Sequence, residues 1–462
     1  MMQSPALKKN FLSKSEVKAM DLEHKRKLSF NIGKYNETVV KGKQQFADLD
    51  LARKKAKNIK WKTIEKLDYY LEAFEKQFTK NGGKVIWASD ADEANAAVLE
   101  ICRKHECRQV VKSKSMVTEE IHLNAFLEKH EIESVETDLG EYIQQLDGET
   151  PYHIVTPAMH KSKEDCARVF HEKLGTEPNL TPGEITAVAR QKLRAKYTSA
   201  GVGVTGANFI IADSGSVCVT ENEGNGRLTT AFPKVHVAIV GIEKIIPSLM
   251  DLNLFWPLLA TYGTGQQVTV YNSIFSGPAR NQEPDGPKEM YVILLDNGRT
   301  KLLADPHVRE SMYCIRCGSC LNACPVYKNI GGHTYGSTYS GPIGSVITPH
   351  MKEFETFKHL SYASTLCGNC TEVCPLRINL HHMLHYNRTL AVDRYHKELT
   401  EQGGWKLWKV AMLHRRLVDV AGSNAKTRLV HILFKDSWGK RRSDLQFQKS
   451  FRQQWKERNT VS

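Results

Sequence analysis

Cysteines in two closely spaced runs are the residues of this sequence best suited to chemistry. The first run contains Cys314, Cys317, Cys320 and Cys324 and is followed by Pro325. Gaps of two residues allow three thiolates to converge from one loop on a small inorganic core, whereas the fourth cysteine leaves the loop. Two-cluster ferredoxins have this spacing, and their fourth cysteine binds the other cluster. The first run therefore predicts an iron–sulfur centre.

The second run has only three cysteines, which are Cys367, Cys370 and Cys374. Ser364 stands where the pattern would place a fourth. We expect two clusters of the [4Fe-4S] type that draw ligands from both runs. Cluster 1 would be bound by Cys314, Cys317, Cys320 and Cys374, and cluster 2 by Cys324, Cys367 and Cys370. The fourth position of cluster 2 stays open: Ser364 Oγ, water or another residue fills it, or the cluster has three irons.

A zinc site is the main alternative, because thiolates also bind zinc. Zinc would require four ligands in two pairs, which does not explain a triplet and a crossing cysteine that recur downstream. Buried free thiols are a second alternative, which the spacing disfavours. His333 lies in the glycine-rich segment between the runs. It is a candidate for tuning or binding a cluster, although a loop histidine more often does neither.

A polar loop, Lys112-Ser113-Lys114-Ser115, is a separate candidate site. It follows a predicted strand and precedes a predicted helix, and ligands of open α/β sheets bind at this edge. Two ammonium groups, two hydroxyls and a helix N-terminus would suit a carboxylate or a phosphate. The alternative is a solvated loop whose serine caps the helix. Lys112 and Lys114 are therefore low-ranking catalytic candidates.

Alternating strands and helices are predicted around this loop. A buried strand at 85–88, strands at 109–111 and 132–137, and helices such as 119–129 form βαβ units, which indicate a parallel sheet. Further strands are expected at 208–212, 216–220, 235–241, 268–271 and 291–295, and the turn Asp213-Ser214-Gly215 predicts a hairpin. The segment 201–206 leads into a strand, so its glycines are not a dinucleotide fingerprint. The fold class is α/β with a mixed sheet.

Four regions follow from these patterns. Residues 1–80 are basic and helical, with one apolar stripe from Trp61 to Phe78 that ends at Asn81-Gly82-Gly83. Residues 81–300 form the α/β domain, and residues 301–400 form a helical, ferredoxin-like domain with both cysteine runs. Residues 401–462 are a basic tail that contains tryptophans.

Composition and charge narrow the class of protein. The chain has 462 residues, of which 41% are hydrophobic and 25% charged, as in globular proteins. Residues 1–80 hold 19 basic against 10 acidic side chains, and residues 401–462 hold 14 against 5. These flanks suit an acidic partner or peripheral association with an anionic membrane, or are solvated faces. No nucleic-acid-binding motif, membrane span or secretory signal is visible, so we expect a cytoplasmic protein without nucleic acid.

The motifs of the α/β region resemble those of the LUD (lactate-utilisation) domain. They are Ala212 to Gly215, Thr220-Glu221-Asn222-Glu223-Gly224-Asn225, and Val240-Gly241-Ile242-Glu243-Lys244. Joined to the two cysteine runs, they resemble the iron–sulfur protein B family of bacterial lactate utilisation. The resemblance implies an α/β fold related to sugar isomerases and CoA transferases, followed by a helical ferredoxin domain. It also implies oxidation of L-lactate to pyruvate with a cysteine-rich iron–sulfur protein A, a LUD protein C and an unknown electron acceptor.

Glu221 and Glu223 become candidates through this resemblance, because a glutamate in a similar place is the acyl-accepting nucleophile of CoA transferases. Glu221 ranks first, because it lies nearer the end of the predicted strand. The alternative is a polar turn in which Arg227 is charge-paired. We expect an electron-transferring subunit of a lactate-oxidising complex, not catalytic alone and without bound flavin. The alternatives are a ligand-binding or acyl-transfer enzyme with structural clusters, and a redox-sensing regulator.

Overall fold

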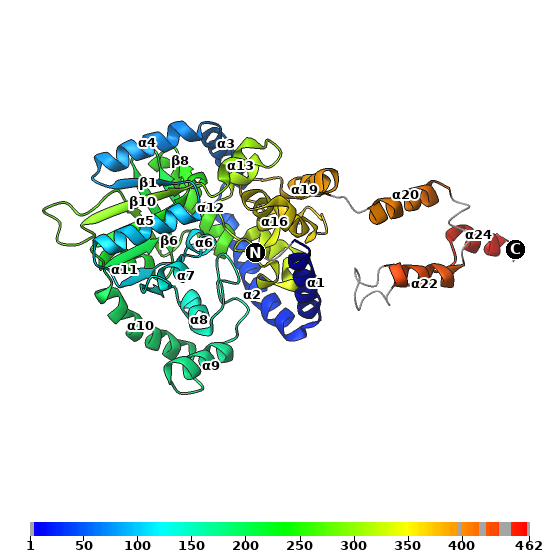
Figure 1. Cartoon of the computed structure of the whole chain (residues 1–462), viewed down its shortest axis with the longest axis horizontal. Helices are drawn as coiled ribbons and strands as arrows, with labels where there is room; N and C mark the ends of the chain where they lie inside the picture. The colour runs from blue at the N-terminus through cyan, green and yellow to red at the C-terminus, as the bar shows by residue number, and fades with distance from the viewer. Residues whose placement is uncertain (1–3, 396–398, 415–421, 434–444, 460–462) are drawn as a thin grey trace. The chain divides into compact units, whose positions relative to one another are not determined.

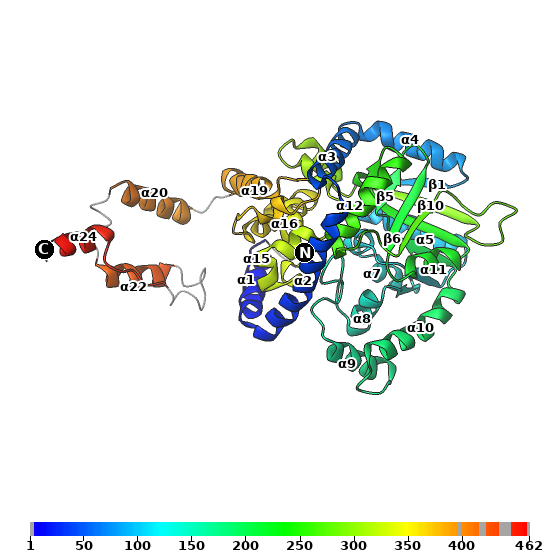
Figure 2. The same ribbon diagram turned by 180° about the vertical axis from the view of Figure 1, so that it is seen from behind.

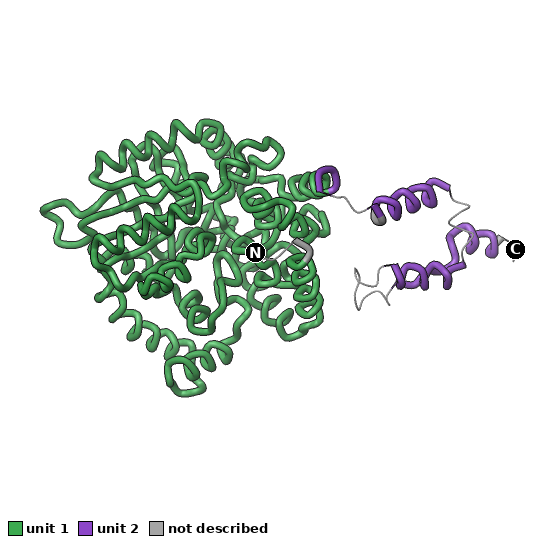
Figure 3. The backbone as a smooth tube through the Cα atoms, viewed as in Figure 1, with its two compact units in different colours: residues 1–391 green, residues 392–462 purple. Residues whose placement is uncertain are grey.

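The computed structural model describes residues 4–395, 399–414, 422–433 and 445–459. These residues form two compact units, Met1–Ala391 and Val392–Ser462 (Figure 3). Phe74, Phe209 and Leu321 come from three of the regions expected from the sequence, and all three belong to one hydrophobic core. The boundaries expected after residues 80, 300 and 400 therefore stay predictions.

A parallel sheet of six strands has the order β1-β10-β7-β4-β2-β3 (Figure 1). The strands are β1 Lys84–Ala88, β2 Gln109–Lys112, β3 Glu133–Glu136, β4 Val202–Thr205, β7 Val235–Gly241 and β10 Glu289–Leu295. Every residue of β7 is buried, as expected for a central parallel strand covered on both faces. Because the strands are parallel, their carboxyl ends all meet at one edge of the sheet.

A second sheet of four strands has the order β8-β5-β6-β9. Its strands are β5 Phe209–Ile211, β6 Ser216–Glu221, β8 Ile245–Ile246 and β9 Tyr271–Phe275. β5 and β6 are antiparallel, so the hairpin predicted at Asp213-Ser214-Gly215 is confirmed. β5 and β8 are parallel, which makes this sheet mixed. The predicted α/β fold is confirmed, with its strands divided between two sheets.

Eight helices surround the sheets between residues 91 and 264. They are α5 Ala91–Lys104, α6 Met116–Glu120, α7 Leu123–Glu128, α8 Leu139–Asp147, α9 Lys163–Leu174, α10 Pro182–Ser199, α11 Asn225–Ala231 and α12 Leu252–Thr264. Side-chain caps fix several starts: Asp90 accepts from Glu93 N and Asp138 from Gly140 N and Glu141 N. Thr181 and Glu184 form a capping box with Pro182 at the first turn of α10.

Four helices precede the sheets: α1 Ser4–Met20, α2 Leu22–Gly42, α3 Leu49–Glu65 and α4 Leu67–Lys80. Figures 1 and 2 place α1 and α2 beside the helices that follow the sheets. α1 contacts α15 (Pro325–Ile330) and α17 (Phe354–Phe357), and α2 contacts α12 and α15. The basic N-terminal region is thus part of the same packed unit.

The region with the cysteine runs is helical, and no strand occurs among the described residues 301–395. Besides α15 and α17, its helices are α13 Arg299–Ala304, α14 Ser319–Ala323, α16 Gly341–Met351, α18 Asn369–Glu372 and α19 Leu380–Tyr395. The second unit contains α20 Leu399–Leu413, α22 Ser423–Leu433 and α24 Phe451–Asn459. Within the described parts of the chain, no helix has the length and apolarity needed to cross a membrane.

Two helix predictions are wrong in detail. The stripe from Trp61 to Phe78 is divided between α3 and α4, which are separated at Lys66, and Trp61 is exposed while the other stripe residues are buried. The helix expected over 119–129 is interrupted: α6 ends at Glu120, and His122 has φ 55° before α7 begins. A left-handed residue cannot continue a right-handed helix, and apolar periodicity does not reveal such a break.

Three strand predictions also need correction. The strand at 85–88 is not buried, because β1 is an edge strand and Trp87 is exposed. The strand expected at 268–271 is β9, which begins only at Tyr271. The segment 201–206 does not merely lead into a strand: it contains β4, which pairs with β2 and β7 in the centre of the parallel sheet.

Candidate iron–sulfur centres and adjoining cavity

The two cysteine runs adopt the same local structure. Gly318 and Gly368 both precede a short helix, α14 or α18, and both have left-handed φ values of 79° and 81°. A residue with a Cβ rarely adopts this conformation, so glycine suits the tight turns between Cys317 and Cys320 and between Cys367 and Cys370. α14 packs against α18, and Asn369 Nδ2 donates to Ala323 O at 3.1 Å. The runs therefore face each other as a pseudo-symmetric pair.

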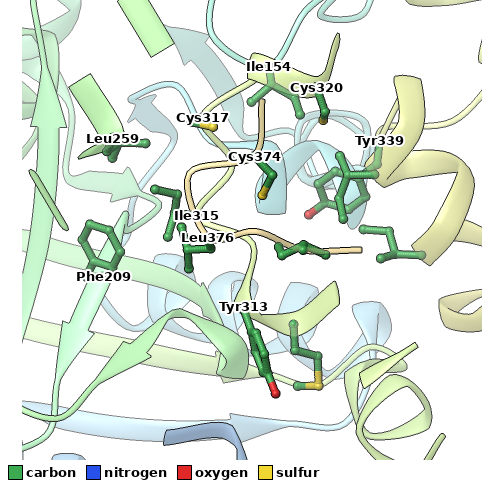
Figure 4. Packing of buried hydrophobic residues seen from close by; sticks show 14 of the residues in the cluster. Ile154, Phe209, Leu259, Tyr313, Ile315, Cys317, Cys320, Tyr339, Cys374 and Leu376 are labelled. Carbon is green, nitrogen blue, oxygen red and sulfur yellow. The ribbon is translucent and has the colours of Figure 1, made fainter. Parts of the chain in front are cut away.

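The thiols fall into two neighbourhoods. Burial raises the pKa of Cys374, and the nearby Cys317 and Cys314 raise it further. Burial likewise raises the pKa of Cys370 to about 11, with added contributions from Cys324 and Cys367. Figure 4 shows Cys317, Cys320 and Cys374 close together beside Ile315 and Leu376. These neighbourhoods favour the crossed ligand sets, which stay a prediction.

The spacing of the thiols bears on the zinc alternative. In a tetrahedral zinc site with Zn–S bonds of about 2.3 Å, the sulfurs lie roughly 3.8 Å apart. Among the described residues, the only three or more potential ligands whose donor atoms all lie within 4.8 Å of one another are Glu149, His160 and His333. No three thiols approach so closely, so the arrangement suits a larger inorganic core. The donor set of seven thiols fits iron–sulfur clusters.

The environment of the thiols differs between the two neighbourhoods. Cys317, Cys320 and Cys374 are buried, and Cys314 is half-buried. Cys367 is exposed. Cys320 interacts electrostatically with Cys370 as well as with its own neighbours, so the two neighbourhoods adjoin. One centre would thus be enclosed by protein, and the other would reach the surface at Cys367.

Ser364 is half-buried and tied to its own loop. Its Oγ accepts from Leu366 N at 3.1 Å, and its carbonyl accepts from Arg388 Nη2 at 2.6 Å. One lone pair of the hydroxyl remains available, so a bond to iron stays open as a prediction. The contacts of His333 are different: its Nε2 lies 2.7 Å from Thr150 O, and its ring stacks edge-on against Tyr152 and His160.

A cavity of about 460 Å³ lies at the carboxyl edge of the parallel sheet. Residues after β2, β3, β4 and β7 line it, and so do residues of the second sheet and α12. Cys317 and Arg316 from the first cysteine run form part of the wall. The cavity thus connects the α/β fold with the enclosed thiol neighbourhood, a junction that neither motif alone predicted.

The polar loop predicted as a site is only partly in this cavity. Ser113, Lys114 and Ser115 line it. The Lys114 ammonium donates to Val155 O at 2.7 Å and lies 3.7 Å from Asp138 Oδ2. Lys112 does not line the cavity: its ammonium is fully buried 2.7 Å from Glu136 Oε1 and 3.1 Å from Glu119 Oε1. Its contacts are those of an internal ion pair.

Glu221 and Glu223 both line the cavity, but their surroundings differ. The Glu221 carboxylate accepts from Gly226 N at 2.6 Å and Arg227 N at 2.9 Å, so it caps α11. Within the described part of the chain, Glu223 accepts a hydrogen bond only from Leu139 N, at 3.1 Å. Burial, followed by the nearby charge of Asp138, raises the pKa of Glu223 to about 7. Glu223 is therefore the better placed of the two to exchange a proton near neutral pH.

Lys244, Arg316 and Tyr339 also line the cavity and were not among the site residues predicted from the sequence. Arg316 stacks on Tyr339, with 4.5 Å between the guanidinium and the ring centre. Arg316 follows Cys314 by two residues, and Lys244 ends a motif that we quoted only for its resemblance. Two features of the sequence could have indicated these residues: the positive charge of Lys244 and Arg316, and the position of Arg316 between two cysteines of the first run.

A buried ion network supports this wall. Arg299 Nε donates to Glu243 at 2.5 Å, and its terminal nitrogens donate to Glu120 at 2.9 and 2.8 Å. Tyr339 Oη donates to Glu120 at 2.6 Å. Burial would raise the pKa of Glu243, but Arg299 and then Arg316 lower it to about 2. Glu243 is therefore an anion held between two arginines.

The comparisons with known proteins agree with both halves of the structure. The LUD domain family matches residues 71–295, and the 4Fe-4S dicluster domain family matches residues 310–378. A solved structure of a DUF162 family protein from Deinococcus radiodurans shares 14% identity with 50% of this chain and 98% of that chain, at a TM-score of 0.29. The class is thus an iron–sulfur protein built from a LUD domain and a 4Fe-4S dicluster domain.

Curated relatives share most of the chain. Lactate utilization protein B from Anoxybacillus flavithermus is 44% identical, over 76% of this chain and 74% of that protein. The proteins of the same name from Bacillus cytotoxicus and Geobacillus thermodenitrificans are 41% and 45% identical, over 82% and 74% of this chain and 80% and 72% of theirs. The chain belongs to the lactate utilization protein B family.

Proposed function

We propose that this protein is the iron–sulfur electron-transfer subunit of a multi-protein system that oxidises L-lactate to pyruvate. The relatives' name supports the pathway, and the match to a dicluster domain supports the cofactor. The ligands would be Cys314, Cys317, Cys320 and Cys374 for cluster 1 and Cys324, Cys367 and Cys370 for cluster 2. The fourth ligand of cluster 2 is Ser364, water or another residue, or is absent in a three-iron form.

The observation that carries this proposal is the position of the thiols between a cavity and the surface. Cys317 lines the cavity, Cys320 and Cys370 adjoin, and Cys367 is exposed. A pair of clusters in these places would pass electrons from the cavity through cluster 1 and cluster 2 to a partner at the surface. Enclosure of the first centre limits reaction with solvent, whereas exposure of the second allows close approach of an acceptor.

The proposed reaction determines how many electrons and protons the system must transfer. Oxidation of L-lactate to pyruvate releases two electrons and two protons, and iron–sulfur clusters each carry one electron at a time. Glu223, with its pKa raised to about 7, can accept one of these protons at neutral pH and release it to solvent. We assign catalysis to the assembled system, with this chain as one subunit.

The partners we propose are a cysteine-rich iron–sulfur protein A and a LUD protein C, with an electron acceptor still to be identified. The basic residues at both ends of the chain would attract acidic surfaces of such partners. Exposed Trp405, Trp408 and Trp455 in the second unit add apolar contact area to the positive charge. This unit is therefore the first place to seek a docking surface.

Anaerobic reconstitution tests the function. Clusters of the purified protein should be reduced by L-lactate only when the companion proteins are present, as followed by loss of visible absorbance and appearance of paramagnetic signals. D-lactate is the matched control substrate. Reduction by neither substrate in the complete system would refute the electron-transfer role.

A LUD-type acyl-transfer enzyme is the second candidate. The capping role of Glu221 disfavours it, because both oxygens of the expected nucleophile accept backbone N–H groups. Exchange of acyl groups that does not depend on lactate, and that is lost in Glu223→Gln, would favour this second candidate over the first.

A further inference from the structure

Two cations face the cavity on the wall that carries Cys317. They are Lys244, which is 7% exposed, and Arg316, whose side chain is 10% exposed. Leu259, Ala260 and Gly263 line the cavity as well. Buried positive charge is costly unless an anion accompanies it, and Glu243, which pairs with Arg316, is already shared with Arg299. This wall therefore has the character of an anion site.

The hydrogen-bonding capacity of these cations is largely unused. Arg316 Nη2 lies 3.5 Å from Glu243 Oε1, but Arg316 Nε and Nη1 are buried without a hydrogen-bond partner among the described residues. The Lys244 ammonium likewise donates no hydrogen bond within the described part of the chain. Two guanidinium N–H groups and an ammonium can together bind a carboxylate, for which the planar fork of arginine is well shaped.

The rest of the cavity argues against a phosphate as the anion. The start of α11 would be the natural place for one, but Gly226 N and Arg227 N already donate to Glu221. Ser115 caps α6 by accepting from Thr118 N. Glu223 and Asp138 add negative charge to the wall. A doubly charged phosphate would meet these carboxylates, whereas a singly charged acid can place its one charge beside Lys244 and Arg316.

We propose that Lys244 and Arg316 bind the carboxylate of a small 2-hydroxy or 2-oxo monocarboxylic acid in this cavity, beside cluster 1. The choice of acid rests on the proposed function, whereas the carboxylate site rests on the two cations. The cavity of about 460 Å³ is larger than a three-carbon acid requires. The site should therefore also accept 2-hydroxy acids of four to six carbons, with the chain along the apolar wall.

The competing explanation is that Lys244 and Arg316 only balance the negative charge of cluster 1. Both explanations predict that loss of Lys244 changes the reduction potential of that cluster. Only a ligand site predicts that loss of Lys244 also weakens the binding of an organic acid. Affinity and potential must therefore be measured on the same variant.

The experiment uses the full chain with its clusters, purified without air and without partners. Calorimetric titration with L-lactate and with pyruvate should give saturable binding to the wild type. Lys244→Met keeps the length of the side chain and removes the charge, and it should weaken binding at least tenfold, since a charge-assisted hydrogen bond is lost. Lys192→Met, on the exposed face of α10, is the control and should bind like the wild type.

The outcomes separate the explanations. An unchanged iron content of Lys244→Met shows that the variant is intact, and Lys244→Arg should restore much of the affinity. A shifted cluster 1 potential with unchanged affinity for the acid in Lys244→Met would overturn the proposed site. Inorganic phosphate that binds to the cavity as tightly as L-lactate would also overturn it. If no acid binds to the chain yet lactate reduces its clusters in the complete system, the site is wrong and the electron-transfer role stands. If the acid binds to the chain but the clusters are not reduced in the complete system, the site is right and the electron-transfer role is wrong.

Discussion

Arg316 Nη2 lies 3.5 Å from Glu243 Oε1, and this pair joins the loop of the first cysteine run to the end of β7. Lys60 from α3 reaches the same place, where its buried ammonium donates to the carbonyls of Glu243 at 2.5 Å and Ile245 at 3.0 Å. The N-terminal helices, the parallel sheet and the cysteine region thus meet at Glu243. The iron–sulfur part and the LUD part should therefore fold as one unit.

Single cysteine substitutions should remove one cluster at a time. Cys317→Ala should lose cluster 1 and Cys370→Ala should lose cluster 2, so each should hold about half of the wild-type iron and sulfide. Thermal stability should also fall, because metal binding and folding are linked. Cys166→Ala, on α9 and outside both runs, is the control and should keep its iron. Stoichiometric zinc in place of iron would contradict the assignment.

Ser364 should make cluster 2 the more labile of the two. Oxygen binds iron less strongly than thiolate does, so a cluster with three cysteine ligands should lose iron first in air. Electron paramagnetic resonance should then detect an oxidised three-iron cluster. Ser364→Cys should suppress this loss, and an unchanged spectrum in Ser364→Ala would show that Ser364 is not a ligand. Loss of cluster 1 first would contradict the crossed ligand sets.

Cluster 1 should have a higher reduction potential than cluster 2, so the electron step from cluster 1 to cluster 2 would run uphill and would be driven by the final transfer to the acceptor. Lys60, Lys244 and Arg316 all interact electrostatically with Cys314, and buried positive charge stabilises the reduced, more negative form of a cluster. In cluster 2, Cys324 interacts instead with Lys328. A redox titration followed by electron paramagnetic resonance measures both potentials. Equal potentials, or the opposite order, would show that these cations do not set the difference.

Arg299→Leu should destabilise the protein by about 3–5 kcal/mol, because it leaves Glu120 and Glu243 buried without their partner. Denaturant unfolding under anaerobic conditions measures the loss. The matched control is Arg168→Leu, which removes an exposed pair with Glu172 and should cost far less. Similar losses in both variants would mean that the buried network contributes no more than a surface ion pair.

Glu223 should make the protein less stable as the pH rises from about 4.5 to 7. Its pKa is raised to about 7 in the folded state, so the folded form binds a proton that the unfolded form has already released over this range. The effect should stay below about 1 kcal/mol, because the side chain also meets solvent. Glu223→Gln should lose this part of the pH dependence, whereas Glu100→Gln, exposed on α5, should keep it. If the free energy of unfolding depends on pH in the same way in wild type and Glu223→Gln, the pKa of Glu223 is not raised.

The sequence by itself determined the class of chemistry and the fold class. The cysteine spacing and the following proline are local constraints, so they are legible without tertiary structure. The same is true of the hairpin at Asp213-Ser214-Gly215. Apolar runs located most strands for the same reason, because a parallel strand that is buried on both faces is apolar along its whole length.

Only the tertiary structure decided which residues share the cavity. Lys114, Glu223, Lys244 and Arg316 are far apart in the sequence, and they meet because parallel strands end at one edge and the first cysteine loop packs there. It also separated Lys112 from Lys114: β2 ends at Lys112, so Lys114 lies in the loop beyond the strand, where the alternation of the strand no longer fixes its direction. Lys112 forms an internal ion pair with Glu136, whereas Lys114 lines the cavity. Side-chain direction and long-range packing depend on the whole fold, and so residue type and spacing could not supply them.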